Sequence, residues 1–179
     1  MAGKAETQAN VKFSYRKYYW FRNKINPNFA GRFYSDMQID PVARSLCFGD
    51  TQPAYVLSTE PLRIAAYSDE FDAVVVLDFP AEFVEKFNVT AGMKLTSSVT
   101  YFRDNRLPDD LFPGEDTSGR YSDFMPIIQL FLGKNDAKIA EKTALFDDSV
   151  WKKVIEKAIA YRDAHPGMYR DGLSFFKKP

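Results

Sequence analysis

The clearest pattern in the chain is an unbroken apolar run, Ala73-Val74-Val75-Val76-Leu77, bounded by Asp72 and Asp78 and closed by Pro80. Successive side chains of a strand point to opposite faces of its sheet, so a continuous apolar run of this length predicts a strand buried on both faces. We therefore expect residues 73–79 to form the central strand of a sheet, with Val74 to Leu77 almost fully buried.

Short turns on either side of polar-apolar alternation predict the neighbouring strands. The turn Ser58-Thr59-Glu60-Pro61 separates expected strands at residues 54–57 and 62–67, and a second short turn leads into the central strand. Connections of this length favour antiparallel pairing. Residues 94–102 alternate in the same way, and residues 125–132 return to an apolar strand pattern.

Apolar residues at helical spacing predict helices elsewhere in the chain. The clearest helix covers residues 149–164, is capped by Asp148 or Ser149 and ends at His165-Pro166-Gly167. The other expected helices cover residues 41–46, 80–87 and 136–144. These elements predict a single α+β domain over residues 11–179, in which a mostly antiparallel sheet of five to seven strands is covered on one face by the C-terminal helix and the short central helix. Residues 1–10 are polar and are expected to be a disordered lead-in.

The N-terminal segment is rich in aromatic and basic residues and predicts two further strands. Residues 11–21 alternate, and a strand there would present Arg16, Tyr18, Trp20 and Arg22 on one face, with Arg32 nearby. A second strand is expected over residues 29–37. Aromatic rings between cations on a sheet are typical of surfaces that bind single-stranded nucleic acid. The alternative is that the two aromatic residues pack under a helix and the arginines pair with the acidic middle of the chain.

Charge is balanced over the whole chain but not along it. The chain has 24 basic and 24 acidic residues. Residues 1–35 carry a net charge of +6, residues 36–123 a net charge of −9, and the remainder a net charge of +3. The zero total gives no general case for nucleic acid or membrane. The single cysteine and the lack of an 18-residue apolar run favour a cytoplasmic protein without a membrane partner.

Candidate catalytic chemistry is sparse. The one histidine, His165, lies at an expected helix end, where it can interact with the helix dipole, and Cys47 lies between apolar neighbours. Glycine-rich phosphate loops and clustered zinc ligands do not occur in the sequence. Acids at 69–72 and 104–116 leave a carboxylate-metal-dependent hydrolase as the third hypothesis. We assign no catalytic residue, no metal ligand and no cofactor.

A short stretch, Phe79-Pro80-Ala81-Glu82-Phe83-Val84-Glu85-Lys86-Phe87-Asn88-Val89-Thr90-Ala91-Gly92-Met93-Lys94-Leu95, resembles one half of the swapped-hairpin DNA-binding domains found in transcription regulators and antitoxins. The shared order is strand, proline, acidic-apolar helix, glycine turn, basic residue and strand. The likeness covers 17 of 179 residues, and Ala91 stands where that family has a proline before its glycine. Such units occur on many folds, so the stretch carries no assignment.

The longest irregular segment covers residues 103–124 and mixes acids with basic and aromatic residues. Long irregular segments in compact domains are commonly functional or disordered. This composition suits a segment that binds a partner protein, although a solvated connection is the alternative. The leading hypothesis is therefore a non-enzymatic binding or accessory module with a protein partner, and its candidate residues in this segment are Arg103, Arg106, Phe112, Arg120 and Tyr121.

Overall fold

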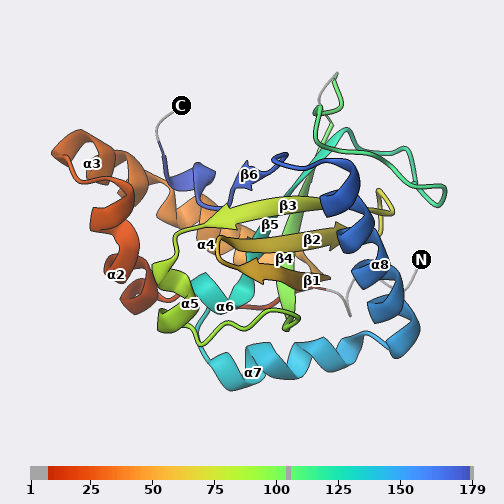
Figure 1. Ribbon diagram of the computed structural model, residues 1–179. Helices are drawn as coiled ribbons and strands as arrows, with labels where there is room; N and C mark the ends of the chain where they lie inside the picture. Colours follow the sequence, from red (N-terminus) through yellow and green to blue (C-terminus); the bar gives the residue numbers. More distant parts are fainter. Residues whose placement is uncertain (1–7, 104–105, 178–179) are drawn as a thin grey trace.

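The computed structural model describes residues 8–103 and 106–177 and has an α+β fold (Figure 1). The helices are α2 (Tyr15–Ile25), α3 (Phe29–Met37), α4 (Ile39–Phe48), α5 (Glu82–Lys86), α6 (Gln129–Leu132), α7 (Asp136–Glu141) and α8 (Asp148–Ala164), with 3-10 turns η1 (Lys142–Leu145) and η2 (Ser174–Phe176). The strands are β1 (Asp50–Thr59), β2 (Leu62–Ser68), β3 (Ala73–Phe79), β4 (Lys94–Phe102), β5 (Asp123–Ile128) and β6 (Arg170–Asp171). The predicted fold class is confirmed.

The described strands form one sheet in the order β5-β4-β1-β2-β3-β6. All neighbours pair antiparallel except β3 and β6, which pair parallel. The predicted meander is confirmed as β1-β2-β3, and the predicted strand at residues 94–102 is confirmed as β4. Because β1 and β2 lie between β3 and β4, the strands that flank α5 are not neighbours, and the resemblance to a swapped hairpin does not extend to the sheet.

The strand β3 is buried on both faces, as the apolar run predicts. Val74, Val75, Val76 and Leu77 are at most 4% exposed. Val75 and Leu77 belong to the large core, whereas Val74 and Val76 point to the other face of the sheet. The central strand of the prediction is therefore confirmed.

The two predicted covering helices lie on opposite faces of the sheet. α8 places Val154 and Ala158 against Val74 and Val76. α5 packs on the other face, where the rings of Phe83 and Phe79 are 5.9 Å apart. The prediction that both helices cover one face is wrong, because Phe79 and Phe83 belong to the large core, whereas α8 packs on the residues of the opposite face.

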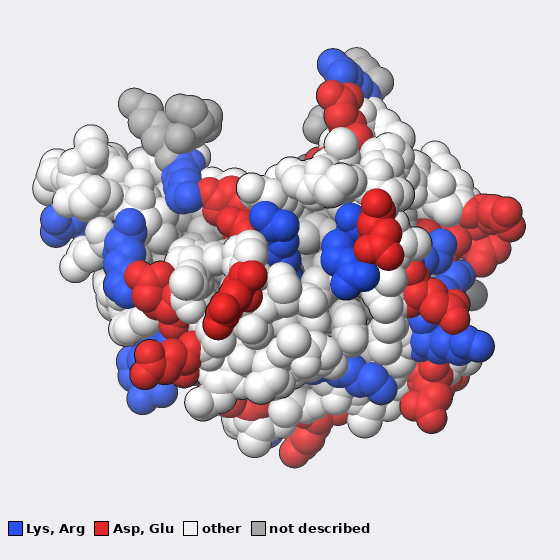
Figure 2. All heavy atoms as spheres, in the orientation of Figure 1, with Lys and Arg blue, Asp and Glu red and all other residues white. Residues whose placement is uncertain are grey.

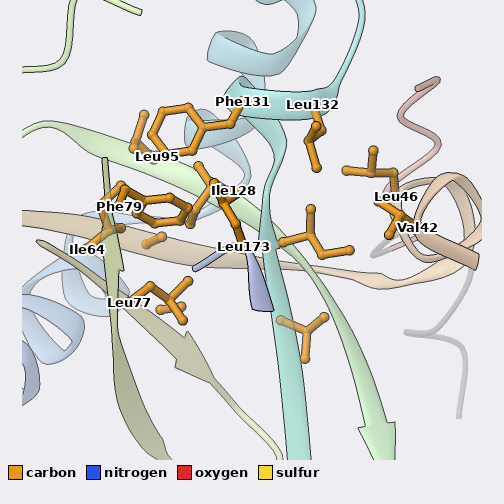
Figure 3. Packing of buried hydrophobic residues seen from close by; sticks show 14 of the residues in the cluster. Val42, Leu46, Ile64, Leu77, Phe79, Leu95, Ile128, Phe131, Leu132 and Leu173 are labelled. Atoms are coloured by element: carbon orange, nitrogen blue, oxygen red, sulfur yellow. The ribbon is translucent and has the colours of Figure 1, made fainter. Parts of the chain in front are cut away.

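The large core lies on the face of the sheet opposite α8, where α2, α4, α5 and α6 close it. Figure 3 shows Phe79 and Ile128 from the sheet beside Phe131 and Leu132 of α6, with Leu46 from α4 at the edge. One polar side chain, Gln129, is fully buried at the start of α6. Its amide oxygen accepts a hydrogen bond from the hydroxyl of Thr96 at 2.8 Å, and its amide nitrogen donates to that of Ser98 at 3.1 Å. The apolar pattern at residues 125–132 is thus strand only as far as Ile128.

The sheet is curled, and an arginine joins its two ends. Arg170 of β6 donates to the Phe124 carbonyl of β5 at 2.8 Å and to the Asp123 carboxylate at 3.0 Å. It also pairs with Asp110 at 2.5 Å. The bonds to Phe124 and the proline at position 126 protect the outer edge of β5 from further strand pairing.

The two predicted N-terminal strands are wrong, because both segments are helical. Ser14 caps α2 by accepting the Lys17 backbone N–H, and Asn28 caps α3 by accepting the Gly31 backbone N–H. Before α2, Ala9 is fully buried and its N–H donates to the Gly49 carbonyl at 2.9 Å. The packed part of the described chain therefore begins ahead of the expected domain boundary, and the rest of the expected lead-in, residues 1–7, lies outside the described residues.

Candidate functional site

The five candidate residues of the N-terminal segment lie on α2 and α3 and not on a strand. Tyr18 is fully buried, and its hydroxyl donates to Asp36 at 2.8 Å. Burial and this carboxylate raise the pKa of Tyr18. Arg22 pairs with the same carboxylate at 3.1 Å, and Arg32 donates to the backbone at the start of its own helix. Arg16 is exposed on α2.

The fifth residue, Trp20, is half-buried and packs against α5. Its ring lies against the rings of Phe83 and Phe87, with centroids 5.6 and 6.0 Å away. The ammonium groups of Lys24 and Lys86 lie 4.8 and 5.2 Å from the ring. Both aromatic residues therefore pack against neighbouring elements, as in the alternative interpretation, and they do not lie with the arginines on the face of a strand.

The described part of the 103–124 segment is fixed to the body of the protein. Leu111 is buried, and the N–H of Gly114 donates to the Phe71 carbonyl at 2.9 Å. Phe112 stacks on His165 with ring centroids 4.0 Å apart. His165 directly follows α8, as the sequence predicts. Its ring packs on Phe112 and so contributes to holding the segment on the body of the protein.

A buried carboxylate, Asp72, anchors the same segment to α8. It lies 2.8 Å from the Lys153 ammonium and 3.2 Å from that of Lys157, and it accepts the Tyr67 hydroxyl at 3.0 Å. Burial alone would raise the pKa of Asp72, but the hydrogen bonds from the lysines and the tyrosine lower it to about 2. Lys153 also pairs with Asp116 at 3.0 Å. The carboxylate is thus ionised and neutralised by cations at any physiological pH.

Three candidates of the segment meet around one ring. The guanidinium groups of Arg103 and Arg120 lie 5.3 and 5.9 Å from the Tyr121 ring centroid, and Arg120 also pairs with Glu70. A fourth candidate, Arg106, pairs with Asp109 at 2.9 Å at a fully solvated position away from this ring. The structure therefore brings together Arg103, Arg120 and Tyr121 and leaves Arg106 and Phe112 elsewhere.

A hollow of about 440 Å³ opens beside Tyr121, between α4, the start of β1 and the end of β4. We call it the Tyr101 hollow. The residues that matter for its chemistry are Arg44, Phe48, Asp50, Thr100, Tyr101 and Tyr121. Its volume falls in the range of ligand-binding sites.

The wall of the Tyr101 hollow is aromatic and its surroundings are mixed in charge. The rings of Tyr101 and Tyr121 stack with centroids 4.9 Å apart. The Tyr101 hydroxyl donates to Asp69 at 3.2 Å, and burial raises the pKa of Tyr101. Phe48 is 64% exposed. Arg44 is exposed and has no hydrogen bond or ion pair within the described residues, so its guanidinium is available to a ligand.

Sequence reasoning missed Arg44, Phe48 and Tyr101. The first two lie four residues apart on α4, opposite the face that buries Val42 and Leu46. Arg44 lies within the predicted helix, but Phe48 lies beyond its predicted end at residue 46, so a helical-wheel view of that helix would not have paired them. Their proximity to Tyr101 depends on the pairing of β1 with β4 and could not be read from a local pattern.

Within the described residues, no group of three or more His, Cys, Asp or Glu side chains lies close enough to hold a metal ion. Several acids of the two predicted clusters pair with basic side chains, as Asp72 and Asp116 do with Lys153, whereas Asp69 accepts hydrogen bonds from Gln52 and Tyr101. Nor does any helix in the described part of the chain have the length and apolar character needed to cross a bilayer.

Comparisons of this chain with models of protein families, with curated proteins and with solved structures found no match.

Proposed function

We propose that this protein is a non-enzymatic binding module that receives a polypeptide segment of a partner protein in the Tyr101 hollow. The observation that carries the proposal is the pairing of an available cation, Arg44, with an exposed aromatic side chain, Phe48, on the same rim of the hollow. Large apolar side chains are usually buried, so one exposed beside a concave surface favours a contact with another molecule.

The chemistry of the rim suggests which segment would bind. A carboxylate of the partner can accept two hydrogen bonds from the Arg44 guanidinium, a geometry that favours arginine over lysine. An apolar side chain next to that carboxylate would then lie on Phe48 and on the edge of Tyr101. We therefore expect the bound segment to carry Asp or Glu adjacent to a large apolar residue.

The surroundings of the hollow favour a polypeptide over single-stranded nucleic acid. Asp69 accepts the Tyr101 hydroxyl at 3.2 Å beside the hollow, and its carboxylate opposes a chain of many phosphates more strongly than a segment that carries a single carboxylate. The Tyr121 ring is already stacked on Tyr101 and contacted by two guanidinium groups, so stacking of a base would have to displace them. Neither the nucleic-acid hypothesis nor the metal-dependent hydrolase has a supporting observation of its own. The proposal places the protein in the cytoplasm, which its single free cysteine favours.

The test screens the purified protein against a displayed library of random peptides. We expect enriched peptides with an acidic residue beside a large apolar one, and we expect Arg44→Glu to weaken their binding about tenfold or more, because a charge-assisted hydrogen bond becomes a repulsion. Arg16→Glu is the matched control, since Arg16 is an exposed arginine without an ion pair in the described chain. It should leave peptide binding unchanged.

A second probe separates the nucleic-acid alternative. Fluorescence anisotropy with a single-stranded oligonucleotide at low salt should show no binding. Binding that falls steeply with salt and is lost in Arg44→Glu would replace the polypeptide by nucleic acid as the ligand of the hollow. Peptides that bind wild type and Arg44→Glu equally would show that the hollow is not the binding site.

A further inference from the structure

The helix α3 packs with its polar side inward and its apolar side outward. Within the described chain, Ser35 is its one buried residue, whereas Phe29, Phe33 and Met37 are 85%, 61% and 59% exposed. These three residues follow one another at intervals of four and so form one stripe along the helix. A surface helix normally buries such a stripe against the core.

The buried residue of α3 is held by hydrogen bonds. The Ser35 hydroxyl donates to the Phe176 carbonyl at 2.8 Å, and the Asn26 amide donates to the same oxygen at 2.8 Å. Helices shorter than about 12–15 residues are marginal in water and depend on packing of their apolar side. α3 has 9 residues, and its apolar side has no cover in the described part of the chain. The helix therefore lacks the contact that would normally stabilise it.

The exposed stripe continues onto α2. Tyr15 and Tyr19 are each 50% exposed, and their rings stack with centroids 6.3 Å apart. Arg22 connects the two helices, because its guanidinium lies 5.0 Å from the Tyr19 ring centroid and pairs with Asp36 of α3. We call the five exposed residues the α2–α3 face: Tyr15, Tyr19, Phe29, Phe33 and Met37.

The α2–α3 face has the size and the position of an interface. α2 and α3 form one end of the molecule, and the surface over α3 is largely uncharged (Figures 1 and 2). If a full side chain of this size presents about 200 Å², the exposed fractions amount to roughly 600 Å². The Arg22–Asp36 pair divides this area into two parts, so it is not one continuous patch, but the sum approaches the roughly 800 Å² that each partner buries in a standard interface.

We propose that a second copy of this chain covers the α2–α3 face. The stripe is symmetric about Phe33, with Phe29 four residues before it and Met37 four residues after it. If two copies of α3 cross antiparallel at Phe33, Phe29 meets Met37 of the partner subunit on both sides of the two-fold axis. This is the self-complementarity that a two-fold interface requires.

Charge is compatible with this pairing. Arg22 and Asp36 lie between the two parts of the face and are already paired with each other. A second copy therefore meets no uncompensated like charge there. The face involves none of the residues that define the Tyr101 hollow, so the inference does not depend on the proposed function.

Sedimentation equilibrium of the full chain tests the proposal. At concentrations from about 1 μM to 1 mM, where weak dimers are populated, the wild type should approach twice the monomer mass of 20.5 kDa. Phe33→Asp should be monomeric, because it places two carboxylates together at the two-fold axis. Leu145→Asp is the control, since Leu145 is 60% exposed but lies outside the face, and it should dimerise as the wild type does.

A charge-pair experiment tests the antiparallel register. Phe29→Glu and Met37→Lys should each weaken the dimer about tenfold or more, since each sets a charge against an apolar residue. The double variant should recover much of this loss, because each new glutamate then faces a lysine of the partner subunit. Failure of the double variant to recover the dimer, with both single variants weakened, would overturn the register.

Other occupants of the face would be recognised by the same series. A monomeric wild type over the whole concentration range overturns the proposal, as does a dimer that survives Phe33→Asp. A monomeric wild type that binds anionic lipid vesicles, with binding lost in Phe33→Asp, would assign the face to a membrane surface instead. Correct folding of every variant is checked by its thermal unfolding curve.

Discussion

Replacing Asp72 by asparagine removes one charge from the anchor that holds the 106–122 segment on α8. Asp72 is 4% exposed and faces the ammonium groups of Lys153 and Lys157. Its φ of 48° lies in the left-handed region, which asparagine tolerates about as well as aspartate. Asparagine also keeps the shape of the side chain and an acceptor for the Tyr67 hydroxyl. The substitution therefore removes the negative charge, and it also replaces one of the two acceptor oxygens by an amide donor.

The magnitude follows from the pKa of Asp72. The folded protein holds it at about 2, compared with 3.8 for an unperturbed aspartate. At about 1.4 kcal/mol per pH unit, this difference corresponds to about 2 kcal/mol of stability at neutral pH. The figure is an upper one, because the Lys153 side chain is 41% exposed and solvent screens its charge. For a domain of this size, 2 kcal/mol corresponds to a fall in Tm of roughly 4–8 °C.

The sign of the pH dependence is fixed by the direction of the shift. Because the pKa is lower in the folded state, the unfolded state binds the proton more readily, and the stabilisation is present above the unfolded pKa. It is lost as the pH falls from about 4 to about 2, and about half of it is gone at pH 3. The free-energy difference between wild type and Asp72→Asn should shrink in the same range.

Urea unfolding at pH 7 and at pH 3 measures this difference, since urea adds no salt that would screen the ion pairs. Asp116→Asn is the control: it shares Lys153 with Asp72 but is well exposed, so it should cost less than about 1 kcal/mol at either pH. A difference between wild type and Asp72→Asn that is as large at pH 3 as at pH 7 would refute the assignment of the stability to the charge. Equal costs for the two substitutions would refute the role of burial.

Three further substitutions test the fold. Val75→Asp should prevent cooperative unfolding, because an unpaired buried carboxylate costs several kcal/mol against a total stability of roughly 5–15; a soluble variant with the wild-type Tm would show that β3 is not the core. Arg170→Met leaves the Asp110 carboxylate without its cation and should lower the free energy of unfolding in urea by about 3 kcal/mol; a loss below about 1 kcal/mol would show that the join between the sheet ends contributes little. Gly114→Ala places a methyl group against the backbone and carboxylate of Asp72 and should make the surrounding loop more sensitive to limited proteolysis, so an unchanged cleavage rate would count against the anchor.

The sequence predicts an element correctly where the spacing of its apolar residues fits only one of the two periods, that of a strand or that of a helix. The run at residues 73–79 is too short for a buried helix and too uniformly apolar for an exposed strand, so it fits one structure. The helix α8 has seventeen residues with a single stripe, and its cap, Asp147, lies one residue before the first of the two predicted caps, Asp148 and Ser149. Turn residues between the strands predicted the β1-β2-β3 meander. Local signals were sufficient wherever burial and period agreed.

The candidate site was predicted only in part, because its residues come together through the sheet. Tyr121, Arg103 and Arg120 share one irregular segment and could be proposed from composition. Tyr101 joins them through the pairing of β4 with β5, in which it lies opposite Phe124. Arg44 lies on a helix that the sequence predicts, but the sequence does not show which side of this helix faces Tyr101. Long-range register and helix orientation depend on the whole core, and a local pattern does not contain them.

The wrong prediction of two N-terminal strands has a physical cause, and the same cause explains why the α2–α3 face is exposed. Residues four apart lie on one side of a strand, whose period is two, and on one side of a helix, whose period is 3.6. Phe29, Phe33 and Met37 therefore fit either element, and burial, which usually decides between them, is absent because the stripe faces outward. The deciding signal was Asn28, whose side chain accepts the Gly31 N–H at 2.7 Å and begins a helix directly after a proline turn. A stripe that does not enter the core of its own chain is maintained at a cost in solubility unless something covers it. The exposed apolar stripe of α3 thus has two consequences. It made the sequence pattern ambiguous between a strand and a helix, and it is the surface that we propose a second copy covers.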